Sequence, residues 1–288
     1  MVQDTNTPMR IPDVAQGEEF EAPLPGGATD EEYLQGVNAM DGHLGEKPEP
    51  PTMDFAPDAA VDLPVPIAHP MRGDLRRAEV RELTGEDEED FAKGRDSNAK
   101  IARLVARGTV TVEGEEVDLD FVNAMPIGDR DALMLAIRKV TYGDNLDLDL
   151  TCNGCGAKNE ITIDLEEEVE IIKGEETASI PLRRGGEAVV RWPNGSDAQA
   201  VQDFAERKKT ATIAEVNTLL LGRILISVRG DEALGEVTAR SMKMPDRRDV
   251  VNFLDENQPG PAFDKLKHSC VECGRTSPLA IGYEELFR

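Results

Sequence analysis

Aromatic side chains are scarce in this sequence, which has 1 Trp, 3 Tyr and 8 Phe among 288 residues. The hydrophobic share is 39%, below the roughly 45–50% of ordinary globular domains. Part of the chain therefore has too little apolar material to form a packed core. The low aromatic count also favours a core or interface role for the single Trp192 over a role as a platform for stacked bases.

Basic residues are far fewer than acidic ones, and long apolar runs are absent. The chain carries 32 Lys and Arg against 57 Asp and Glu, a formal charge of −25. This balance disfavours duplex DNA or an anionic bilayer as the main partner, because phosphate binding needs clustered cations. No apolar run approaches the roughly 18 residues of a membrane span. The start of the sequence has neither the basic region nor the apolar stretch of a signal peptide, so we expect a cytosolic protein without a membrane span.

Common catalytic motifs are absent too. The sequence contains no phosphate-binding G-x-x-x-x-G-K-[ST], no G-x-S-x-G and no H-E-x-x-H. We interpret the acidic runs at 86–90 and 166–168 as solvated faces, and the basic cluster at 207–209 as a loop. The sequence therefore predicts no enzyme and no catalytic residue.

The sequence has few cysteines, and their spacing is regular. The four cysteines form two C-x-x-C pairs, each followed by Gly, at Cys152, Cys155, Cys270 and Cys273. In a reducing compartment two such pairs favour a metal over disulfides, and four thiolates suit a closed tetrahedral site. We predict structural zinc (Zn²⁺), with iron second and a redox pair or free thiols as the remaining alternatives. A closed site leaves no open position for catalysis.

The spacing of the two pairs has a consequence for the fold. Because 114 residues separate Cys155 from Cys270, we expect an inserted subdomain with the two cysteine knuckles adjacent in space. The nearby His268 is interpreted as an exposed or neighbouring side chain, since four thiolates complete the site. His43 and His69 have no partner motif.

Residues 1–75 differ from the remainder. They hold 11 of the 18 prolines, with 15 acidic and 3 basic residues. Such a composition buries too little apolar surface to offset the entropy of ordering. We predict an extended arm, either disordered or ordered on a neighbouring subunit. One alternating cluster within it is suited to an edge strand or a groove: Val61, Leu63, Val65 and Ile67.

Residues 76–143 are predicted to be mainly helical. Thr84 is the expected N-cap of a helix that runs to about Arg107 and stops at Gly108. A strand at 109–112 follows. Asp129 is expected to cap a second helix, which ends at Gly143.

Residues 144–288 are predicted to form a zinc ribbon with an insertion at about 175–262. Alternating apolar residues at 146–150 and 161–165 predict two strands around the first cysteine pair. Within the insertion we expect a hairpin of 178–183 and 187–192, and three helices at 197–207, from Thr212, and at 246–257. The predicted fold class is therefore α+β, with a helical N-terminal part and an extended N-terminal arm.

The order of these motifs resembles a known family. LTGEDEEDFAK is followed by IGDRDALMLAIRKVTYG, CNGCG, a long insertion ending in a helix, CVECG and the terminal Leu286-Phe287. Over residues 76–288 this order is similar to the zinc-ribbon baseplate proteins of contractile-tailed phages, the T4-type base plate family, and their relatives in phage-like contractile injection systems. The resemblance implies a structural baseplate or hub component, or a factor that assembles one, with the four cysteines as metal ligands.

The resemblance also implies partners and a location. We expect contacts with other baseplate, hub or tail-tube subunits through the arm at 1–75 and the acidic body, without direct nucleic-acid binding. The expected location is the tail baseplate of a virion or a phage-like particle, assembled in a bacterial host cytoplasm. Three alternatives stay open: a tail-assembly chaperone absent from the finished particle, a zinc-ribbon adaptor in transcription or nucleic-acid handling, and a redox enzyme with a sulfur-ligated metal.

Overall fold

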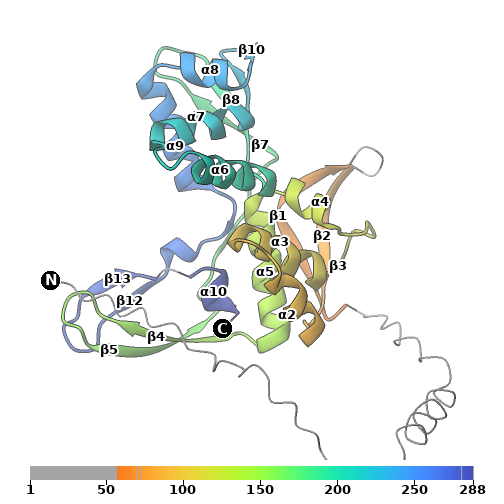
Figure 1. The fold of residues 1–288 in the computed structure, drawn as a ribbon, viewed down its shortest axis with the longest axis vertical. Coiled ribbons are helices and arrows are strands. Elements are labelled where there is room, and N and C mark those ends of the chain that lie inside the picture. Colours follow the sequence, from red (N-terminus) through yellow and green to blue (C-terminus); the bar gives the residue numbers. More distant parts are fainter. Residues whose placement is uncertain (1–56, 70, 72, 280, 288) are drawn as a thin grey trace, which may run out of the picture. The chain divides into compact units, whose positions relative to one another are not determined.

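Antiparallel hairpins with helices between them form the described part of the chain (Figure 1). The computed structural model describes residues 57–69, 71, 73–279 and 281–287. Each strand pair in these residues is antiparallel, which permits short connections between paired strands. Helices and strands are both abundant, so the predicted α+β class is confirmed.

The N-terminal part of the body is a three-stranded sheet covered by helices. Its strands, in the order β1-β2-β3, are β1 (Ala59–His69), β2 (Gly73–Val80) and β3 (Thr109–Val112). Its helices are α2 (Gly85–Ala92), α3 (Ser97–Gly108), α4 (Leu119–Ala124) and α5 (Ile127–Tyr142). Helix α5 packs on β1, β2 and α3, and its apolar side chains Leu133 and Ile137 are fully buried.

Strand β1 corrects the boundary that we expected at residue 75. Leu63 and Val65 are buried on this strand, and Leu75 on β2 is buried as well, so the folded body begins before Arg76. The alternating apolar cluster pairs as an edge strand, where a proline's missing N–H costs little on the open side. Proline content therefore misled the composition argument here. Residues 1–56 of the expected arm, including His43, lie outside the described residues.

The first predicted helix is in fact two helices. Thr84 and Asp87 form the capping box of α2, which confirms the predicted start. The helix ends at Ala92, however, and α3 begins at Ser97 after its N-cap Asp96, whose side chain accepts a hydrogen bond from the N–H of Ala99. Gly94 between them is a poor helix former, and Asp96 offers a competing N-cap, so the continuous helix is interrupted.

The predicted cap of α5 is also wrong. The helix begins at Ile127 with Pro126 as N-cap, which places Asp129 inside the first turn. Asp129 is fully buried, and its Oδ1 accepts a hydrogen bond of 2.8 Å from the N–H of Val65. The carboxylate therefore connects α5 to β1. Gly143 ends the helix with a φ of +85°, as predicted.

Two small hairpins carry the cysteine pairs. Strands β4 (Asn145–Thr151) and β5 (Lys158–Asp164) flank the first pair, as the alternating pattern predicted. Strands β12 (Lys267–Ser269) and β13 (Thr276–Pro278) flank the second pair. A 3₁₀ turn (Phe263–Lys265) precedes β12, and α10 (Tyr283–Leu286) packs against α5 after β13.

The chain between the hairpins forms a separate layer with its own core. Strands β6 (Ile171–Ile172) and β11 (Gly260–Pro261) pair at its base. Its sheet has the order β10-β9-β8-β7, from β7 (Thr177–Pro181), β8 (Glu187–Arg191), β9 (Leu225–Val228) and β10 (Asp231–Glu232). Its helices are α6 (Gly195–Arg207), α7 (Ile213–Ile224), α8 (Glu236–Ser241) and α9 (Met244–Asn257). We call residues 177–257 the insertion layer.

The insertion layer agrees with much of the sequence pattern. The β7–β8 hairpin turns at Gly185 and Gly186, both with positive φ, and Thr212 caps α7. Helix α6 begins two residues before the expected Asp197, because Asn194 is the N-cap. Strands β9 and β10 and helix α8 had no recognised signal. Trp192 is buried and stacks on Phe253 with a ring-centre separation of 6.3 Å, so it is a core residue.

Candidate metal centre

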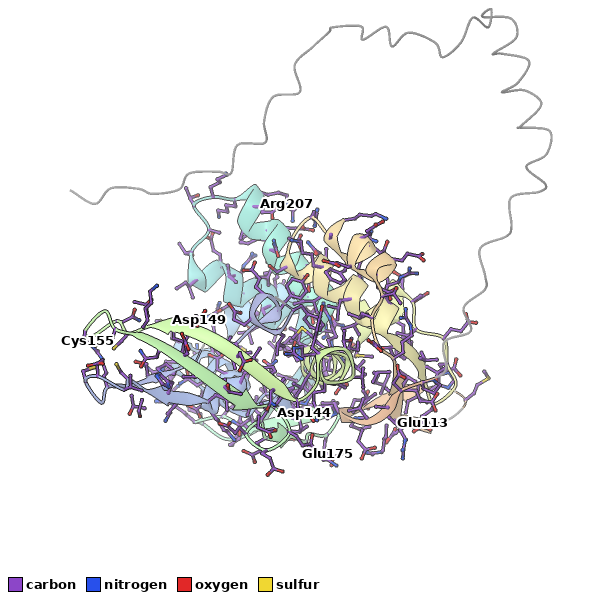
Figure 2. The ribbon with its side chains drawn as sticks, turned by 90° about the horizontal axis from the view of Figure 1, so that it is seen from below. Glu113, Asp144, Asp149, Cys155, Glu175 and Arg207 are labelled. Atoms are coloured by element: carbon purple, nitrogen blue, oxygen red, sulfur yellow. The ribbon has the colours of Figure 1, made fainter. Side chains whose placement is uncertain are left out.

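The four cysteines lie close together in space, although one pair precedes the insertion layer in the sequence and the other follows it. Their Sγ atoms all lie within 4.8 Å of one another. The Sγ atoms of Cys152 and Cys273 are 3.7 Å apart, and those of Cys155 and Cys270 are also 3.7 Å apart. Cys155 lies at the outer end of the β4–β5 hairpin (Figure 2). The predicted proximity of the two knuckles is therefore present in the structure.

The two knuckles have the same type of backbone turn. The N–H of Gly156 donates to the carbonyl of Cys152 at 2.8 Å, and the N–H of Gly274 donates to the carbonyl of Cys270 at 2.9 Å. Both glycines have positive φ, +77° and +69°. This conformation costs little for Gly, so a glycine after each second cysteine allows the chain to return into the next strand.

The sulfur geometry fits a tetrahedral metal ion. Zinc–sulfur bonds of about 2.3 Å place the corners of a tetrahedron about 3.8 Å apart. The two separations of 3.7 Å match this value and exceed the roughly 2.05 Å of a disulfide bond. Four cysteines in this arrangement could hold a metal ion. Iron in a four-sulfur site has a similar geometry.

The surroundings shift the pKa values of the cysteine thiols in different directions. Backbone N–H groups of Cys273 and Glu272 lower the pKa of Cys270 to about 6. At Cys155 the N–H of Ala157 lowers the pKa, but hydrogen bonding with the other thiols and desolvation outweigh it and raise the pKa to about 12. Four adjacent thiolates repel one another, so a cation between them is needed for all four to be deprotonated.

One polar residue beside the site was not identified from the sequence. Asn159 is only 3% exposed. Its Nδ2 donates to the carbonyl of Ala157 at 3.1 Å, and its Oδ1 accepts from the N–H of Val271 at 3.0 Å. Asn159 has the same strand parity as Ile161 and Ile163, so a polar residue on the apolar face of β5 was the available signal.

His268 lies outside the four-sulfur cluster of the described residues. It belongs to β12, and its Nε2 is buried with no hydrogen-bond partner in the described part of the chain. It lines a cleft of about 200 Å³ that also reaches Cys152, Cys270, Asn159 and Arg275. The structure therefore places His268 beside the cysteine site and not in it.

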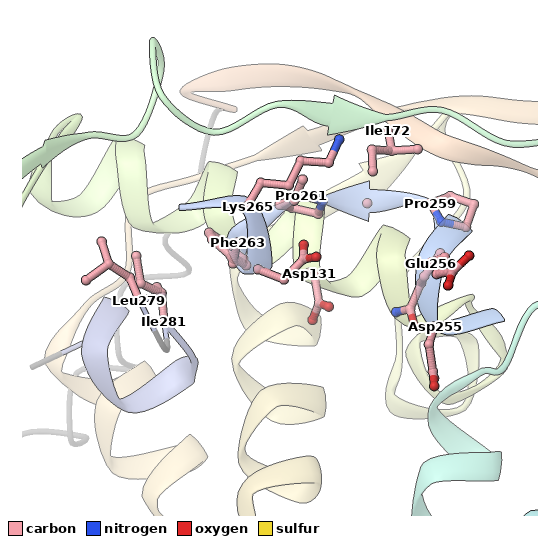
Figure 3. Close-up of a pocket in the computed structure, with 14 residues that line it drawn as sticks. Asp131, Ile172, Asp255, Glu256, Pro259, Pro261, Phe263, Lys265, Leu279 and Ile281 are labelled. Carbon is pink, nitrogen blue, oxygen red and sulfur yellow. The ribbon is translucent and has the colours of Figure 1, made fainter. Parts of the chain in front are cut away.

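A second cleft, of about 440 Å³, lies at the base of the insertion layer (Figure 3). It is lined by Asp131, Asp255, Glu256 and Asp264 together with apolar residues such as Phe263. Burial raises the pKa of Asp131 to about 6, although Arg130 opposes the shift. The described residues that line this cleft include no His, Cys, Ser or Thr, and their one cation, Lys265, pairs with Glu170 at 2.8 Å.

Among the helices of the described residues, none is both long and apolar enough to cross a bilayer. Comparison with curated proteins finds no match, and comparison with solved structures finds none either. The family described as T4 bacteriophage base plate protein matches residues 74–281, which are 208 of the 288 residues. The chain therefore belongs to the T4 bacteriophage base plate protein family, as the motif order predicted, and this membership supports a role as a structural baseplate component.

Proposed function

We propose that this chain is a non-catalytic structural subunit of a contractile-tail baseplate or hub, stabilised by one metal ion on Cys152, Cys155, Cys270 and Cys273. The observation that carries the proposal is the convergence of four Sγ atoms within 4.8 Å in a chain of the baseplate family. Zinc is the proposed metal, because four thiolates in a closed tetrahedral site are typical of structural zinc.

The position of the cysteines gives the metal a mechanical role. The β4–β5 hairpin precedes the insertion layer and the β12–β13 hairpin follows it. A metal that joins the two knuckles would connect the two ends of the insertion by coordination bonds, in addition to the short β6–β11 ladder at its base. Such a link reduces the conformational freedom of the segments that it joins.

The acidic surface is proposed to contact other baseplate, hub or tail-tube subunits. Residues 1–75 carry 15 acidic and 3 basic residues, and we propose that the part of this segment before β1 contributes to these contacts. Opposite charge on a neighbour would steer assembly. Assembly would take place in the bacterial host cytoplasm, whether the final particle is a virion or a related injection system.

Elemental analysis of the purified full chain tests the metal. We expect about one zinc per chain, and we expect Cys270→Ser to lose it, since three thiolates leave the site incomplete. Ser269→Ala is the matched control, because it removes a neighbouring hydroxyl bonded to Thr276 and no sulfur. A folded wild-type chain free of any metal at neutral pH would contradict the proposal.

Mass spectrometry of purified particles tests the baseplate role. A strain that lacks the gene is complemented with wild type, Cys270→Ser or Ser269→Ala. We expect the wild type and Ser269→Ala in complete particles, and an assembly defect with Cys270→Ser. Complete particles that contain Cys270→Ser would rule out a scaffolding role for the metal. Complete particles that never contain the wild-type chain would identify it as an assembly chaperone instead.

A further inference from the structure

The two cysteine hairpins are separate two-stranded sheets. In the described residues, β4 pairs with β5, β12 pairs with β13, and no strand of one hairpin pairs with the other. Isolated two-stranded hairpins are marginally stable in water. The relative position of the two knuckles therefore depends on side-chain contacts that cross between them, and on the metal if one is bound.

One crossing contact extends from the first hairpin to the second. Asn159 belongs to β5, yet its Oδ1 accepts a hydrogen bond from the N–H of Val271 at 3.0 Å. Val271 immediately follows Cys270. Because Nδ2 of the same side chain is bonded to the carbonyl of Ala157, the amide is held at both ends. Asn159 thus fixes the position of the Cys270 backbone relative to the first knuckle.

A second crossing contact runs in the opposite direction. Arg275 belongs to the second knuckle, and its side chain lies over Gly154 of the first. A Cβ at Gly154 would lie 2.9 Å from Cδ and 3.1 Å from Nη1 of Arg275. The guanidinium can take this position only because residue 154 has no side chain. The same Gly154 donates its N–H to Sγ of Cys152 at 3.3 Å.

Charge gives the Arg275 contact a purpose beyond packing. Four thiolates around a divalent ion carry a net charge of −2, which a nearby guanidinium partly offsets. Arg275 also lines the cleft of about 200 Å³ that reaches Cys152 and Cys270. Asn159 lines the same cleft, so the residues of both crossing contacts lie beside these sulfurs.

We propose that Asn159 and Arg275 form a reciprocal clasp between the two knuckles, and that this clasp sets how long the four-cysteine site retains its metal. The inference rests on the proposed function, which supplies the metal. Asn159 is a positioning residue that holds the Cys270 knuckle in place. Arg275 offsets the charge of the thiolates and covers the first knuckle. Groups that orient metal ligands in this way commonly change metal affinity by about 10- to 100-fold.

The test measures metal release from the zinc-loaded full chain to the chromogenic chelator 4-(2-pyridylazo)resorcinol. Asn159→Leu removes both amide contacts at similar volume and is expected to speed release by about 10- to 100-fold. Arg275→Gln removes the charge and shortens the side chain, and a smaller increase is expected, with Arg275→Lys, which keeps the charge, close to wild type. Lys158→Ala, an exposed neighbour on β5, is the control with unchanged release.

Gly154→Ala provides an independent test, because it displaces Arg275 without removing it. We expect it to release zinc as fast as Arg275→Gln. Spectra of the cobalt-loaded chains report the ligand set, and we expect the four-sulfur bands to persist in all of these variants. A loss of these bands with Arg275→Gln or Gly154→Ala would indicate a lost ligand and would contradict a clasp that acts around an intact site.

The outcomes separate the clasp from the proposed function. A wild-type chain that binds neither zinc nor cobalt would refute the metal site itself. A wild type that binds zinc, with Asn159→Leu, Arg275→Gln and Gly154→Ala all releasing it at the wild-type rate, would overturn the clasp alone. If Asn159→Leu fails to fold, the two variants at the exposed Arg275 contact still decide the matter.

Discussion

The cysteine hairpins and the insertion layer are stabilised in different ways. The core of the insertion layer includes Val65 of β1 and the following buried residues of the layer itself: Ile180, Leu182, Ala188, Val190, Trp192, Leu221, Ile224, Leu225, Ala239, Val250 and Leu254. The knuckle ends of the hairpins instead expose most of their residues, Cys155 and Cys273 included. Apolar burial stabilises the first region. In the hairpins it includes Leu146 of β4 and Ile163 of β5, but the exposed knuckle ends depend on what the four sulfurs bind.

Two buried carboxylates, one in the insertion layer and one in the N-terminal part of the body, also differ in how they are stabilised. Asp197, in the insertion layer, accepts hydrogen bonds from Arg191 at 2.6 Å and from Arg223 at 2.7 Å. Asp129, in the body, accepts one bond from Val65, and its Oδ2 is buried with no partner in the described residues. Burial raises the pKa of Asp129 to about 7. At Asp197 burial acts in the same direction, but hydrogen bonds from Arg191, from the N–H of Asn194 and from Arg223 together outweigh it and lower the pKa.

Removal of the metal should have the largest effect and should be confined to one region. We expect Cys270→Ser to lose hydrogen-exchange protection in β4, β5, β12 and β13, because metal-binding free energy stabilises the folded site. Protection in β8 and α7 should persist, since their core contains none of the four cysteines. Ser269→Ala should retain the wild-type pattern in both regions. Equal loss of protection in the insertion layer would show that the two regions fold as one unit.

Asp129→Asn should produce the second largest effect, and only at higher pH. An aspartate whose folded pKa is about 7 and whose ordinary value is 3.8 stabilises the fold below pH 3.8 relative to higher pH. This contribution is lost as the pH rises through 7, because the unfolded chain ionises first. A shift of about three pKa units corresponds to about 4 kcal/mol. The asparagine retains the acceptor for Val65 and does not ionise.

Urea unfolding at pH 5 and pH 8 measures about 3 kcal/mol of this contribution, because the rest is already lost between pH 3.8 and pH 5. Wild type should lose stability between the two values, and Asp129→Asn should lose much less. Asp131, whose pKa is about 6, leaves part of the dependence in the variant. Asp120→Asn, at an exposed position of α4, should behave like wild type. If wild type and Asp129→Asn show the same pH dependence, the buried carboxylate is not the source.

Local patterns in the sequence predicted the clustering of the four cysteines. Alternation around Cys152 and the repeated C-x-x-C-G motif depend on neighbouring residues, so strands β4 and β5 and the four-cysteine cluster followed from them. Asn159 was missed because its role depends on Val271, 112 residues away. Strand β1 was recognised as a possible edge strand but was assigned to an arm, because its prolines indicate an arm until β2 supplies a partner. The errors therefore occur where distant contacts override local composition.

Asp197→Ala should give the smallest of the three effects, and its effect belongs to the insertion layer. The carboxylate is 0% exposed, and loss of one partner of a buried ion pair costs about 3–5 kcal/mol. The side chains of Arg191 and Arg223 are 33% and 38% exposed. Water can therefore solvate the two arginines after the change. We expect about 2 kcal/mol of lost stability, below the lower end of that range.

The pH dependence of Asp197→Ala should be opposite to that of Asp129→Asn. Because the folded pKa of Asp197 is lowered, its contribution is present above the ordinary aspartate pKa and is lost as the pH falls through the folded value. The difference between wild type and Asp197→Ala should thus be largest near neutral pH and should shrink in acid. Glu236→Ala, which breaks the exposed pair with Arg240, should cost at most about 0.5 kcal/mol. A loss for Asp197→Ala as small as this control would mean that the apolar core alone stabilises the insertion layer.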